Sequence, residues 1–419
     1  MNILWITNTL FPDVCIELGI GIPHIGGWMP AAAEALLNKD ATLKLGVASL
    51  YDGIDLKVLV IKNITYFLIP RSQSAPIYDN KLEYYWQQVR ELFKADIVHI
   101  HGSEFPHGLA YINIFPEDNI VISIQGLISV YERYYYGGIS WKALLANITF
   151  RDLFKRDTIF SQRNAMFNRG KFEQKMIKSV RHIIGRTNWD RAQSWAINST
   201  IQYHLNNETL RSEFYKNKWD FNNCEKYTVF LSQAHYPIKG MQQLIFALPL
   251  IIKHFPETKV YVAGHDFVNK NSLRLSGFGR FIKNLIQKNG LEQYIIFTGI
   301  LSEKEIVQRF LASNVFVCPS SIENSPNSIG EAQLLGVPCI GSFVGGMADM
   351  IEDGESGLLY RFEEVEMLAH AICRIFSDES LAQRISANSR AIASLRHHKE
   401  LNSGKLIEIY NTICKDTFR

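Results

Sequence analysis

Residues 315–342 read VFVCPSSIENSPNSIGEAQLLGVPCIGS and contain a strand, a loop, a helix and a second strand in succession. The apolar run VFVCPS (315–320) predicts a buried strand, and CIGSFV (339–344) predicts the strand that follows the helix. The Gly-Val-Pro sequence between them ends the helix, because proline cannot continue it. This order indicates a parallel sheet covered by helices, so the sequence predicts an α/β fold.

The same alternation of strands and helices occurs in two series along the chain. The first series begins with the strand NILWIT (2–7), and the second begins with YTVFLSQ (227–233). Between the two series, residues 197–225 are polar, irregular and rich in asparagine, which is typical of a domain boundary. Further strands are predicted at 43–50, 64–70, 96–101, 119–126 and 182–187 in the first series, and at 258–264 and 295–299 in the second.

We therefore expect two doubly wound, Rossmann-like domains, residues 1–210 and 220–399, that face each other across a cleft. The helix at about 400–419 is expected to pack back on the first domain. Ligands of such sheets bind at the carboxyl ends of the strands, so the loops that follow strands are where site residues are expected.

The composition is that of an ordinary globular protein, with 47% hydrophobic and 20% charged residues among 419. A net charge of +3 is too small to indicate nucleic-acid binding by itself. Six scattered cysteines with no Cys-x-x-Cys pair favour free thiols in a reducing compartment. No signal peptide and no run of eighteen apolar residues is visible, so we expect a cytoplasmic protein without a membrane-spanning segment.

Glu323 and Glu331 flank the loop that opens the predicted helix. Either Ser325 or Asn324 is expected as the N-cap, with Pro326 in the first turn. Carboxylate oxygens accept hydrogen bonds from vicinal hydroxyls, such as those of a ribose or of a second polyol. Two solvated glutamates beside a capped surface helix are the alternative interpretation of this spacing.

The backbone amides of Asn327, Ser328 and Ile329 are expected to lack partners, because they lie in the first turn of the helix. Unpaired amides at the positive end of a helix favour an anion, and a phosphate fits such a site. A phosphate cradle between two carboxylates matches a nucleoside-diphosphate sugar, which has a polyol on each side of its phosphates.

The stretch resembles the E-x7-E signature of the retaining family 4 glycosyltransferases, which have the GT-B fold. The resemblance extends over residues 227–361 and includes GEAQLLGVPCIGS and VGGMADMIEDGESGLLY. In that family the first glutamate contacts the donor sugar, the segment after it contacts the phosphates, and the second glutamate contacts the ribose. The matching positions here are Glu323, then Asn324, Ser325, Asn327 and Ser328, and then Glu331.

The stretch LSQAHYPIKGMQQLI resembles the family's loop in which an arginine and a lysine neutralise the diphosphate. Lys239 matches the lysine, and an exposed lysine at a helix start is the alternative. Gln233 occupies the arginine position, which removes one positive charge. The sequences GHDF and FTGI, which contain Gly264 and Gly299, are expected to lie around the base and complete the donor site.

Two further positions in the first domain resemble the family. Gly26 and Gly27 match a Gly-Gly loop that lets the backbone approach a phosphate or the acceptor, and an ordinary turn is the alternative. Gln125 occupies the position at which many relatives carry a histidine against the sugar. Glutamine can bond to a sugar hydroxyl but cannot titrate, so no histidine base is expected there.

His101 ends the strand DIVHIH, in which alternation puts His99 and His101 on one face. We expect His101 to join Gln125 in the catalytic group, with a structural histidine as the alternative. Arg186, in GRTNWD, is a candidate for contact with phosphate or acceptor, and a buried pair with Asp190 is its alternative.

The resemblance implies a mechanism that uses neither a protein base nor a metal. In the family's usual mechanism the leaving phosphate accepts the proton of the acceptor on the same face of the sugar, while Glu323 provides positioning and charge. No Asp-x-Asp motif and no His/Cys cluster at zinc spacing occurs in the sequence. We therefore expect no metal and no cofactor, with Lys239 and helix amides neutralising the phosphates.

Residues 131–181 are rich in basic and aromatic side chains. This profile is typical of an interfacial helix on anionic lipid, and ordinary helix faces packed on the first sheet are the alternative. Many relatives extend lipid-linked saccharides at the inner face of the plasma membrane, which implies peripheral contact with that surface. No nucleic-acid partner is expected.

The sequence thus predicts a retaining glycosyltransferase that moves a sugar from a nucleoside-diphosphate sugar, by default a UDP-sugar, to a saccharide or lipid-linked saccharide acceptor in cell-surface polysaccharide synthesis. One alternative is a sugar-nucleotide-binding relative without transferase activity, which Gln233 and Gln125 keep open. The other is a sugar-nucleotide 2-epimerase. A Rossmann dehydrogenase is disfavoured, because no Gly-x-Gly-x-x-Gly follows the first strand.

Overall fold

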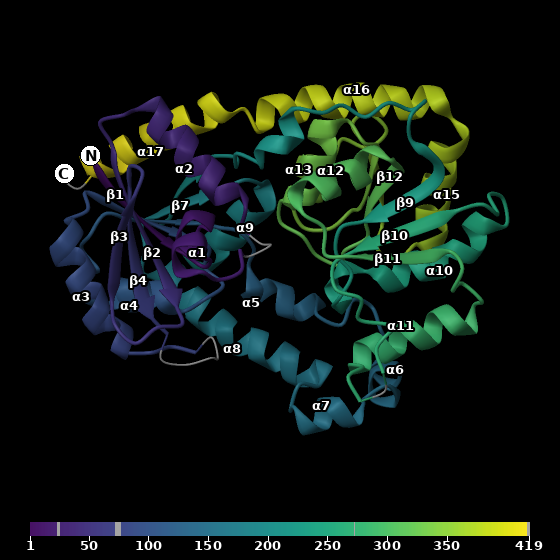
Figure 1. Cartoon of the computed structure of the whole chain (residues 1–419), viewed down its shortest axis with the longest axis horizontal. Helices are drawn as coiled ribbons and strands as arrows, with labels where there is room; N and C mark the ends of the chain where they lie inside the picture. Colours follow the sequence, from purple (N-terminus) through teal and green to yellow (C-terminus); the bar gives the residue numbers. More distant parts are fainter. Residues whose placement is uncertain (23–25, 72–76, 272, 417–419) are drawn as a thin grey trace. The chain divides into compact units, whose positions relative to one another are not determined.

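The computed structural model describes residues 1–22, 26–71, 77–271 and 273–416. The chain divides into two compact units (Figure 1). Unit 1 comprises residues 1–130, 167–210 and 397–419, and unit 2 comprises residues 131–166 and 211–396. This division differs from the expected first domain of residues 1–210, which included the segment 131–166.

The segment 131–166 belongs to unit 2 because its polar groups bond to the helices of that unit. Gln242 Nε2 donates to Gly137 O at 2.7 Å, and Gly277 N donates to Asp152 Oδ2 at 2.7 Å. Nothing in the composition of the segment shows which sheet it joins, since these contacts link positions more than a hundred residues apart.

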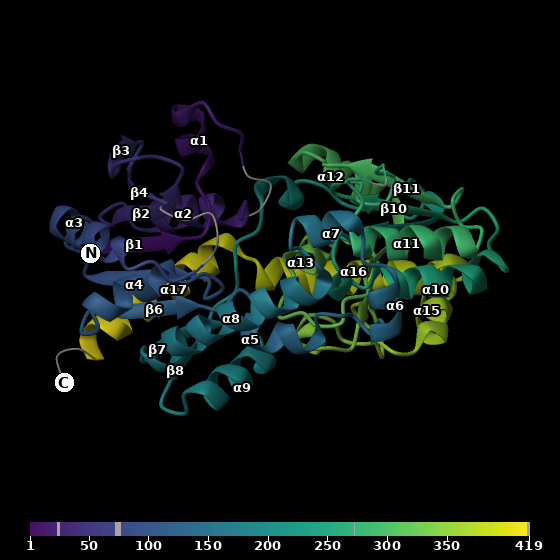
Figure 2. The same ribbon diagram turned by 90° about the horizontal axis from the view of Figure 1, so that it is seen from below.

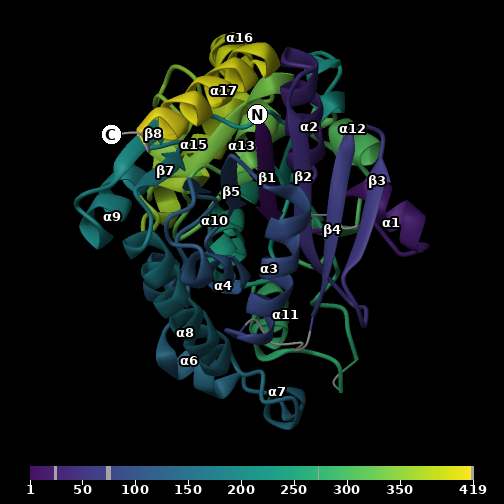
Figure 3. The ribbon, with the colours of Figure 1, turned by 90° about the vertical axis from the view of Figure 1, so that its left-hand side faces the viewer.

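Unit 1 contains an eight-stranded sheet in the order β3-β4-β2-β1-β5-β6-β7-β8, in which β3 is antiparallel to β4 (Figure 3). Its strands are β1 (Asn2–Thr7), β2 (Lys44–Tyr51), β3 (Lys57–Ile61), β4 (Ile64–Pro70), β5 (Ile97–His101), β6 (Ile120–Ser123), β7 (His182–Gly185) and β8 (Gln202–Leu205). Its helices are α1 (Pro12–Leu18), α2 (Trp28–Lys39), α3 (Lys81–Phe93), α4 (His107–Ile114), α9 (Asn188–Ile197) and α17 (Lys399–Asp416).

The predicted strands of unit 1 are confirmed within a few residues, but β3 and β8 were not predicted. β8 lies inside the segment 197–225, which the sequence marked as irregular. It pairs with β7 alone at the edge of the sheet, where a polar strand with exposed side chains is tolerated. Local composition is therefore a poor guide to an edge strand.

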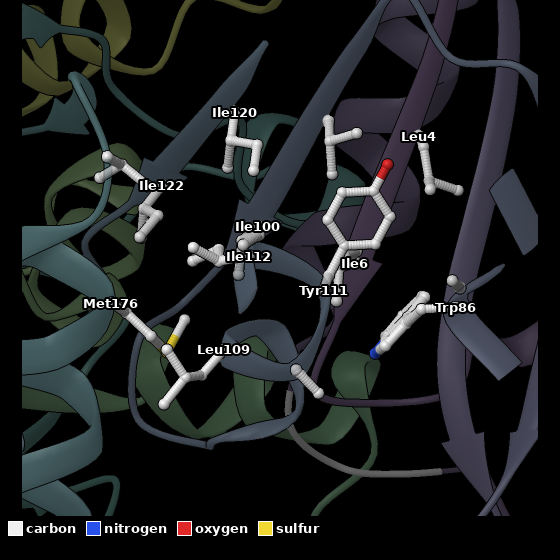
Figure 4. Close-up of a cluster of buried hydrophobic side chains, with 14 of the residues drawn as sticks. Leu4, Ile6, Trp86, Ile100, Leu109, Tyr111, Ile112, Ile120, Ile122 and Met176 are labelled. Atoms are coloured by element: carbon white, nitrogen blue, oxygen red, sulfur yellow. The ribbon is translucent and has the colours of Figure 1, made fainter. Parts of the chain in front are cut away.

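Helices bury both faces of the unit 1 sheet, which explains its near-continuous apolar strands. On one face, Leu4 of β1 belongs to a cluster with Trp86 and Tyr111 (Figure 4). On the other face, Trp5 packs with Tyr410 of α17, and Trp5 Nε1 donates to the Tyr410 hydroxyl at 3.0 Å. With both faces covered, the carboxyl ends of the strands are the accessible part of the sheet.

Unit 2 contains a six-stranded parallel sheet in the order β11-β10-β9-β12-β13-β14. Its strands are β9 (Glu225–Leu231), β10 (Lys259–Ala263), β11 (Ile295–Gly299), β12 (Ser313–Cys318), β13 (Cys339–Ser342) and β14 (Leu358–Tyr360). Its longer helices are α10 (Met241–Ile252), α11 (Gly277–Lys288), α12 (Glu303–Leu311), α13 (Asn327–Leu335), α15 (Val365–Ser377) and α16 (Glu379–Arg396).

Short helices complete unit 2, and two helices contain residues of both units. The short ones are α6 (Trp141–Ala146), α7 (Phe150–Phe154), α14 (Met347–Met350) and the 3-10 turns η1 (Glu132–Tyr134), η2 (Ser212–Tyr215) and η3 (Pro237–Lys239). Those shared in sequence by both units are α5 (Ile128–Tyr131) and α8 (Ile159–Lys178).

Candidate functional site

The loops that follow β9 and β12 bring Lys239 and Glu323 together at the carboxyl edge of the unit 2 sheet. Lys239 Nζ lies 2.6 Å from Glu323 Oε1, and Ser320 Oγ donates to the same oxygen at 2.8 Å. Only 17% of the lysine side chain and 8% of the glutamate side chain are exposed. Two residues predicted from separate motifs therefore form one charged contact.

The surroundings keep Lys239 protonated, and two neutral phenols lie beside the contact. Burial is the largest single influence on Lys239 and disfavours its charged form, but the charge and hydrogen bond of Glu323, together with Tyr236 and Cys318, outweigh burial and hold the pKa of the lysine well above its usual value. Burial, followed by the charge of Glu323, raises the pKa of Tyr131 well above its usual value. Burial also raises the pKa of Tyr236, whose ring lies 5.7 Å from Lys239 Nζ.

Two glycines permit the close packing of these loops. Gly240 has φ +72°, and a Cβ built on it would lie 1.7 Å from Pro319 O. Gly345 has φ +53°, and its Cβ would lie 1.9 Å from Glu323 O. The neighbouring Gly346 N donates to Glu323 O at 3.0 Å. Both positions require glycine for conformation and for space, so the backbone around Glu323 is fixed from two sides.

Helix α13 starts at Asn327, with Pro326 at the N-cap position. The expected caps are wrong, because the Ser325 hydroxyl bonds to Met350 Sδ at 3.3 Å and Asn324 is fully buried. Asn324 N instead bonds to the Tyr131 hydroxyl. Sequence alone did not show that these small polar residues face the interior.

The amino end of α13 leaves two backbone donors open. Within the described part of the chain, the amides of Asn327 and Ser328 have no hydrogen-bond partner, and both residues are half-buried. The expectation for Ile329 is wrong, since its amide donates to Pro326 O at 3.0 Å. Two open amides without a side-chain cap remain able to bind an anion.

Arg211 holds Glu331 through two parallel hydrogen bonds, from Nε to Oε1 at 2.7 Å and from Nη2 to Oε2 at 2.8 Å. Burial raises the pKa of Glu331, and the charge of Arg211 offsets part of the rise. An ionised carboxylate offers about four acceptor positions, so two remain for a ligand. Arg211, the first residue of the second segment of unit 2, was not predicted as a site residue because no recognisable motif surrounds it.

The remaining residues expected at the donor site are two glycines, which are hydrogen-bonded to each other, and Gln233, which lies in a different loop. Gly264 N donates to Gly299 O at 3.0 Å, so the structure brings these two glycines together at the ends of β10 and β11. Both have positive φ, +103° and +76°, with open space where a Cβ would be. Gln233 is exposed in the loop after β9.

In unit 1, three of the expected residues line one cavity of about 40 Å³ at the carboxyl edge of the sheet. His101 comes from the end of β5, Gln125 follows β6, and Arg186 follows β7. A cavity of this size accommodates a few water molecules or a small polar group. Its lining also includes Trp5, Trp28 and Glu208.

His101 is 4% exposed, and neither ring nitrogen has a hydrogen-bond partner among the described residues. The rings of His99 and His101 lie 3.8 Å apart, which confirms that both are on one face of β5. Burial lowers the pKa of His101 to about 3, so the ring is neutral and a weak base. The two ring nitrogens of His101 nevertheless offer one hydrogen-bond donor and one acceptor to a polar group in the cavity.

Arg186 is held by carbonyl groups and by a glutamate that sequence analysis missed. Its Nη2 donates to Gln125 O at 3.0 Å, and its Nη1 lies 2.9 Å from Glu208 Oε2. The alternative of an Arg186–Asp190 ion pair is wrong, because Asp190 accepts from the backbone amide of Arg186 at 2.9 Å. Arg186 Nε and Glu208 Oε1 have no bond to the described residues.

Glu104 is a second acidic residue that the sequence did not single out. It follows β5, is half-buried, and accepts from Gly126 N at 3.2 Å and from Asn8 Nδ2 at 3.3 Å. Burial raises the pKa of Glu104 to about 7. The three contributing loops follow β5, β6 and β1, so this carboxyl group lies at the same edge of the sheet as the predicted residues.

The Gly-Gly loop expected near a ligand lies directly before α2. Gly26 has φ +75°, and a Cβ built on it would lie 2.6 Å from Thr9 Oγ1. Gly27 is the N-cap of α2, whose first residue, Trp28, lines the cavity beside His101 at 5.7 Å between rings. The turn therefore positions a wall of the cavity.

Comparison with known proteins finds similarity between part of the chain and glycosyl-transfer proteins. Residues 211–392 match the family described as glycosyl transferases group 1. The capsular polysaccharide biosynthesis glycosyltransferase CapM of Staphylococcus aureus is 26% identical over 179 residues, 43% of this chain and 44% of that protein. The chain thus spans about half the length of the curated relatives it matches.

Two solved structures share the fold over nearly the whole chain. A sucrose-phosphate synthase from Thermosynechococcus elongatus has a TM-score of 0.70 at 17% identity and covers 99% of both chains. HepE of Anabaena, in complex with UDP and glucose, has a TM-score of 0.66 at 17% identity and covers 98% of this chain and 100% of its own. The expected α/β fold with two Rossmann-like domains, GT-B, is confirmed.

Proposed function

Because residues 211–392 match the family described as glycosyl transferases group 1, we propose that the chain is a retaining glycosyltransferase acting on a nucleoside-diphosphate sugar. The acceptor is a saccharide or a lipid-linked saccharide, as in the synthesis of cell-surface polysaccharides. One observation carries the proposal: Glu323, which forms the buried contact with Lys239, lies four residues before Asn327, the first residue of α13, whose amino end has open backbone amides.

Unit 2 supplies the donor site in this proposal. The open amides of Asn327 and Ser328 bind a phosphate of the donor, and Lys239 neutralises the phosphate that leaves. The two free acceptor positions of Glu331 bind the ribose hydroxyls, while Arg211 keeps that carboxylate ionised and oriented. Glu323 accepts hydrogen bonds from the transferred sugar.

The reaction follows from these contacts without a base on the protein. The bond between C1 of the sugar and the phosphate oxygen breaks, and a bond from C1 to the acceptor oxygen forms on the same face. The acceptor proton passes to the leaving phosphate oxygen, so the products are a nucleoside diphosphate and a glycosylated acceptor. Lys239 and the α13 amides stabilise the charge that develops on the phosphate.

Lys239 has two roles in this scheme. Without a donor it pairs with Glu323 at 2.6 Å. On donor binding, a phosphate competes for the ammonium group, and the released Glu323 oxygen becomes available to a sugar hydroxyl. The exposed Gln233 adds no charge, so Lys239 carries more of the neutralisation than it would beside an arginine.

Unit 1 supplies acceptor contacts. The unbonded groups of its cavity, His101, Arg186 Nε and Glu208 Oε1, mix donors with acceptors, which is the pattern that sugar hydroxyls require. Gln125 and Glu104 extend the same edge of the sheet. UDP is the nucleotide we propose, and the UDP bound by the Anabaena neighbour supports this choice.

The test combines donor binding with product analysis. Thermal stability is measured with UDP-, GDP-, ADP- and dTDP-sugars, for the native chain and for Glu331→Gln. A shift with one nucleotide, lost in the variant, supports the donor site. Transfer to a saccharide acceptor with retained configuration then supports the enzyme, donor binding without turnover supports an inactive relative, and an epimerised donor supports the 2-epimerase. No shift with any donor contradicts the proposal.

A further inference from the structure

Helices α6 and α7 form a two-helix hairpin whose polar groups face its own unit. Asp152 Oδ2 accepts from Gly277 N at 2.7 Å, and Arg280 Nη2 donates to Ala146 O at 2.7 Å. Asn284 Nδ2 donates to Asn147 Oδ1 at 3.0 Å. These bonds fasten the hairpin to α11, next to which it lies in two views (Figures 1 and 2).

Apart from the buried Leu144, the large apolar side chains of α6 and α7 are exposed, which differs from the usual pattern of a surface helix pair. Phe150 and Phe154 of α7 are 77% and 80% exposed, and their rings stack 6.4 Å apart. The hairpin's exposed large apolar side chains are Trp141, Leu145, Phe150, Leu153 and Phe154. Five such residues within fourteen positions form a patch larger than scattered surface hydrophobics produce.

The charges of the hairpin are positive on balance. Arg151 pairs with the acidic residue of the hairpin, Asp152, at 3.0 Å, and with Asp157, which follows the hairpin, at 3.3 Å. Lys142, Lys155 and Arg156 have no acidic partner among the described residues. The exposed apolar residues are therefore accompanied by three cations without an acidic partner, and residues 141–157 carry a net charge of +2.

We infer that this hairpin, residues 141–156, docks the protein on an anionic lipid bilayer. Aromatic side chains partition into the interface between headgroups and acyl chains, and adjacent cations bind anionic headgroups. Among the described residues no helix is both long enough and apolar enough to cross a bilayer, so attachment occurs at the surface. The link to a lipid-linked acceptor rests on the proposed function, whereas the docking itself does not.

The structure narrows the broader expectation for residues 131–181. Tyr135 is buried and bonds through its hydroxyl to Gln162, and Tyr136 packs against Phe160 at 5.6 Å between rings. These aromatics stabilise the fold and do not offer a docking face. The lipid-binding surface that we infer comprises α6, α7 and the turn between them.

The experiment measures binding of the full chain to vesicles of phosphatidylcholine alone and with phosphatidylglycerol. We expect at least tenfold stronger partitioning onto the anionic vesicles, weakened by salt. The triple variant Lys142→Gln, Lys155→Gln, Arg156→Gln should lose about 100-fold, from roughly fivefold for each charge. The matched control removes three exposed lysines elsewhere in unit 2, Lys253, Lys288 and Lys304, and should bind like the native chain.

A second pair of variants tests the apolar side chains. Phe150→Ser with Phe154→Ser should lower partitioning at least tenfold, whereas Ile54→Ser with Val60→Ser, which changes exposed residues of unit 1, should not. All four positions are exposed, so unchanged melting temperatures are expected. Trp141→Phe should remove the blue shift of tryptophan emission that accompanies insertion of this side chain.

Three results overturn the inference. The first is equal binding of the native chain to both vesicle types, and the second is equal binding by the phenylalanine variant and its control. The third is self-association of the native chain that the phenylalanine variant abolishes, since a second copy would then cover the exposed side chains. Donor-induced stabilisation without vesicles separates this inference from the proposed function: it should persist in every hairpin variant, and its absence would count against the donor site alone.

Discussion

Lys239 and Glu323, 84 residues apart in the sequence, form a contact of 2.6 Å between the loops that follow β9 and β12. Ser320 shares the same carboxylate oxygen, and Gly346 holds the backbone oxygen of Glu323. The contact therefore orders both loops before any ligand arrives.

Replacing Lys239 by Met should lower kcat by about 100- to 1,000-fold, because the leaving phosphate loses its cation. It should also lower the free energy of unfolding by about 3 kcal/mol, since Glu323 stays buried without its partner. Steady-state kinetics and urea denaturation measure the two effects. The double variant Lys239→Met, Glu323→Gln should be more stable than the sum of the single losses implies, and strict additivity would contradict coupling.

Replacing Gly345 by Ala should lower the free energy of unfolding by about 2–4 kcal/mol and weaken donor binding, because the new methyl group meets Glu323 O. Gly290→Ala is the matched control, since its φ is +63° but nothing lies within 4 Å of its Cβ position. In the control, the strain of a left-handed backbone at alanine should lower the free energy of unfolding by only about 1 kcal/mol. Equal losses in the two variants would show that the contact with Glu323 is unimportant.

Arg211→Met should make donor binding depend on pH. Removing the guanidinium takes away the charge that offsets the burial of Glu331, so the pKa of that carboxyl rises further. The protonated acid is a poorer acceptor for ribose hydroxyls. Calorimetry at pH 6.5 and 8.5 should show weakened binding that recovers at the higher pH, whereas the native chain should show less change. A loss that is equal at both pH values would assign Arg211 a purely structural role.

Glu104 should make the fold less stable as pH rises. Its folded pKa of about 7 lies above the usual value of 4.5, so the protonated form is favoured by folding. The resulting stability is fully present below pH 4.5 and is lost as pH rises through 7. Glu104→Gln should flatten this dependence and gain about 1–3 kcal/mol over the native chain at pH 8. Denaturation curves of the native chain and of Glu104→Gln at pH 5 and pH 8 test this prediction. If the free energies of unfolding of the two proteins differed by the same amount at both pH values, the role assigned to Glu104 would be contradicted.

Sequence reasoning recovered the elements whose signal is local. β1 was predicted at its observed bounds, and the β12–α13–β13 unit was recognised from an apolar strand and a helix stop. β8 was missed because an edge strand needs little apolar surface. The start of α13 was misplaced because the Ser325 hydroxyl bonds to Met350, a contact 25 residues away that no local pattern encodes.

Residues of the candidate site were predictable from the sequence where they belong to a recognisable motif. Glu323 and Lys239 were identified separately, but their mutual contact depends on loop packing that only three-dimensional structure shows. Arg211, Glu104 and Glu208 were missed, because each is a single charged residue in an ordinary sequence context. Their importance comes from burial and partners, which appear only after folding.

The helix α17 has a consequence for synthesis of the chain on the ribosome. Tyr410 places its hydroxyl against Trp5 Nε1 at 3.0 Å, a contact that joins positions 405 residues apart. The same hydroxyl lies 2.6 Å from His99 Nδ1. The amino-terminal sheet is therefore translated first but completed last, because the part of one face that α17 covers stays exposed until the carboxyl-terminal helix emerges. Any nascent chain that stalls before residue 397 exposes that face to chaperones and proteases.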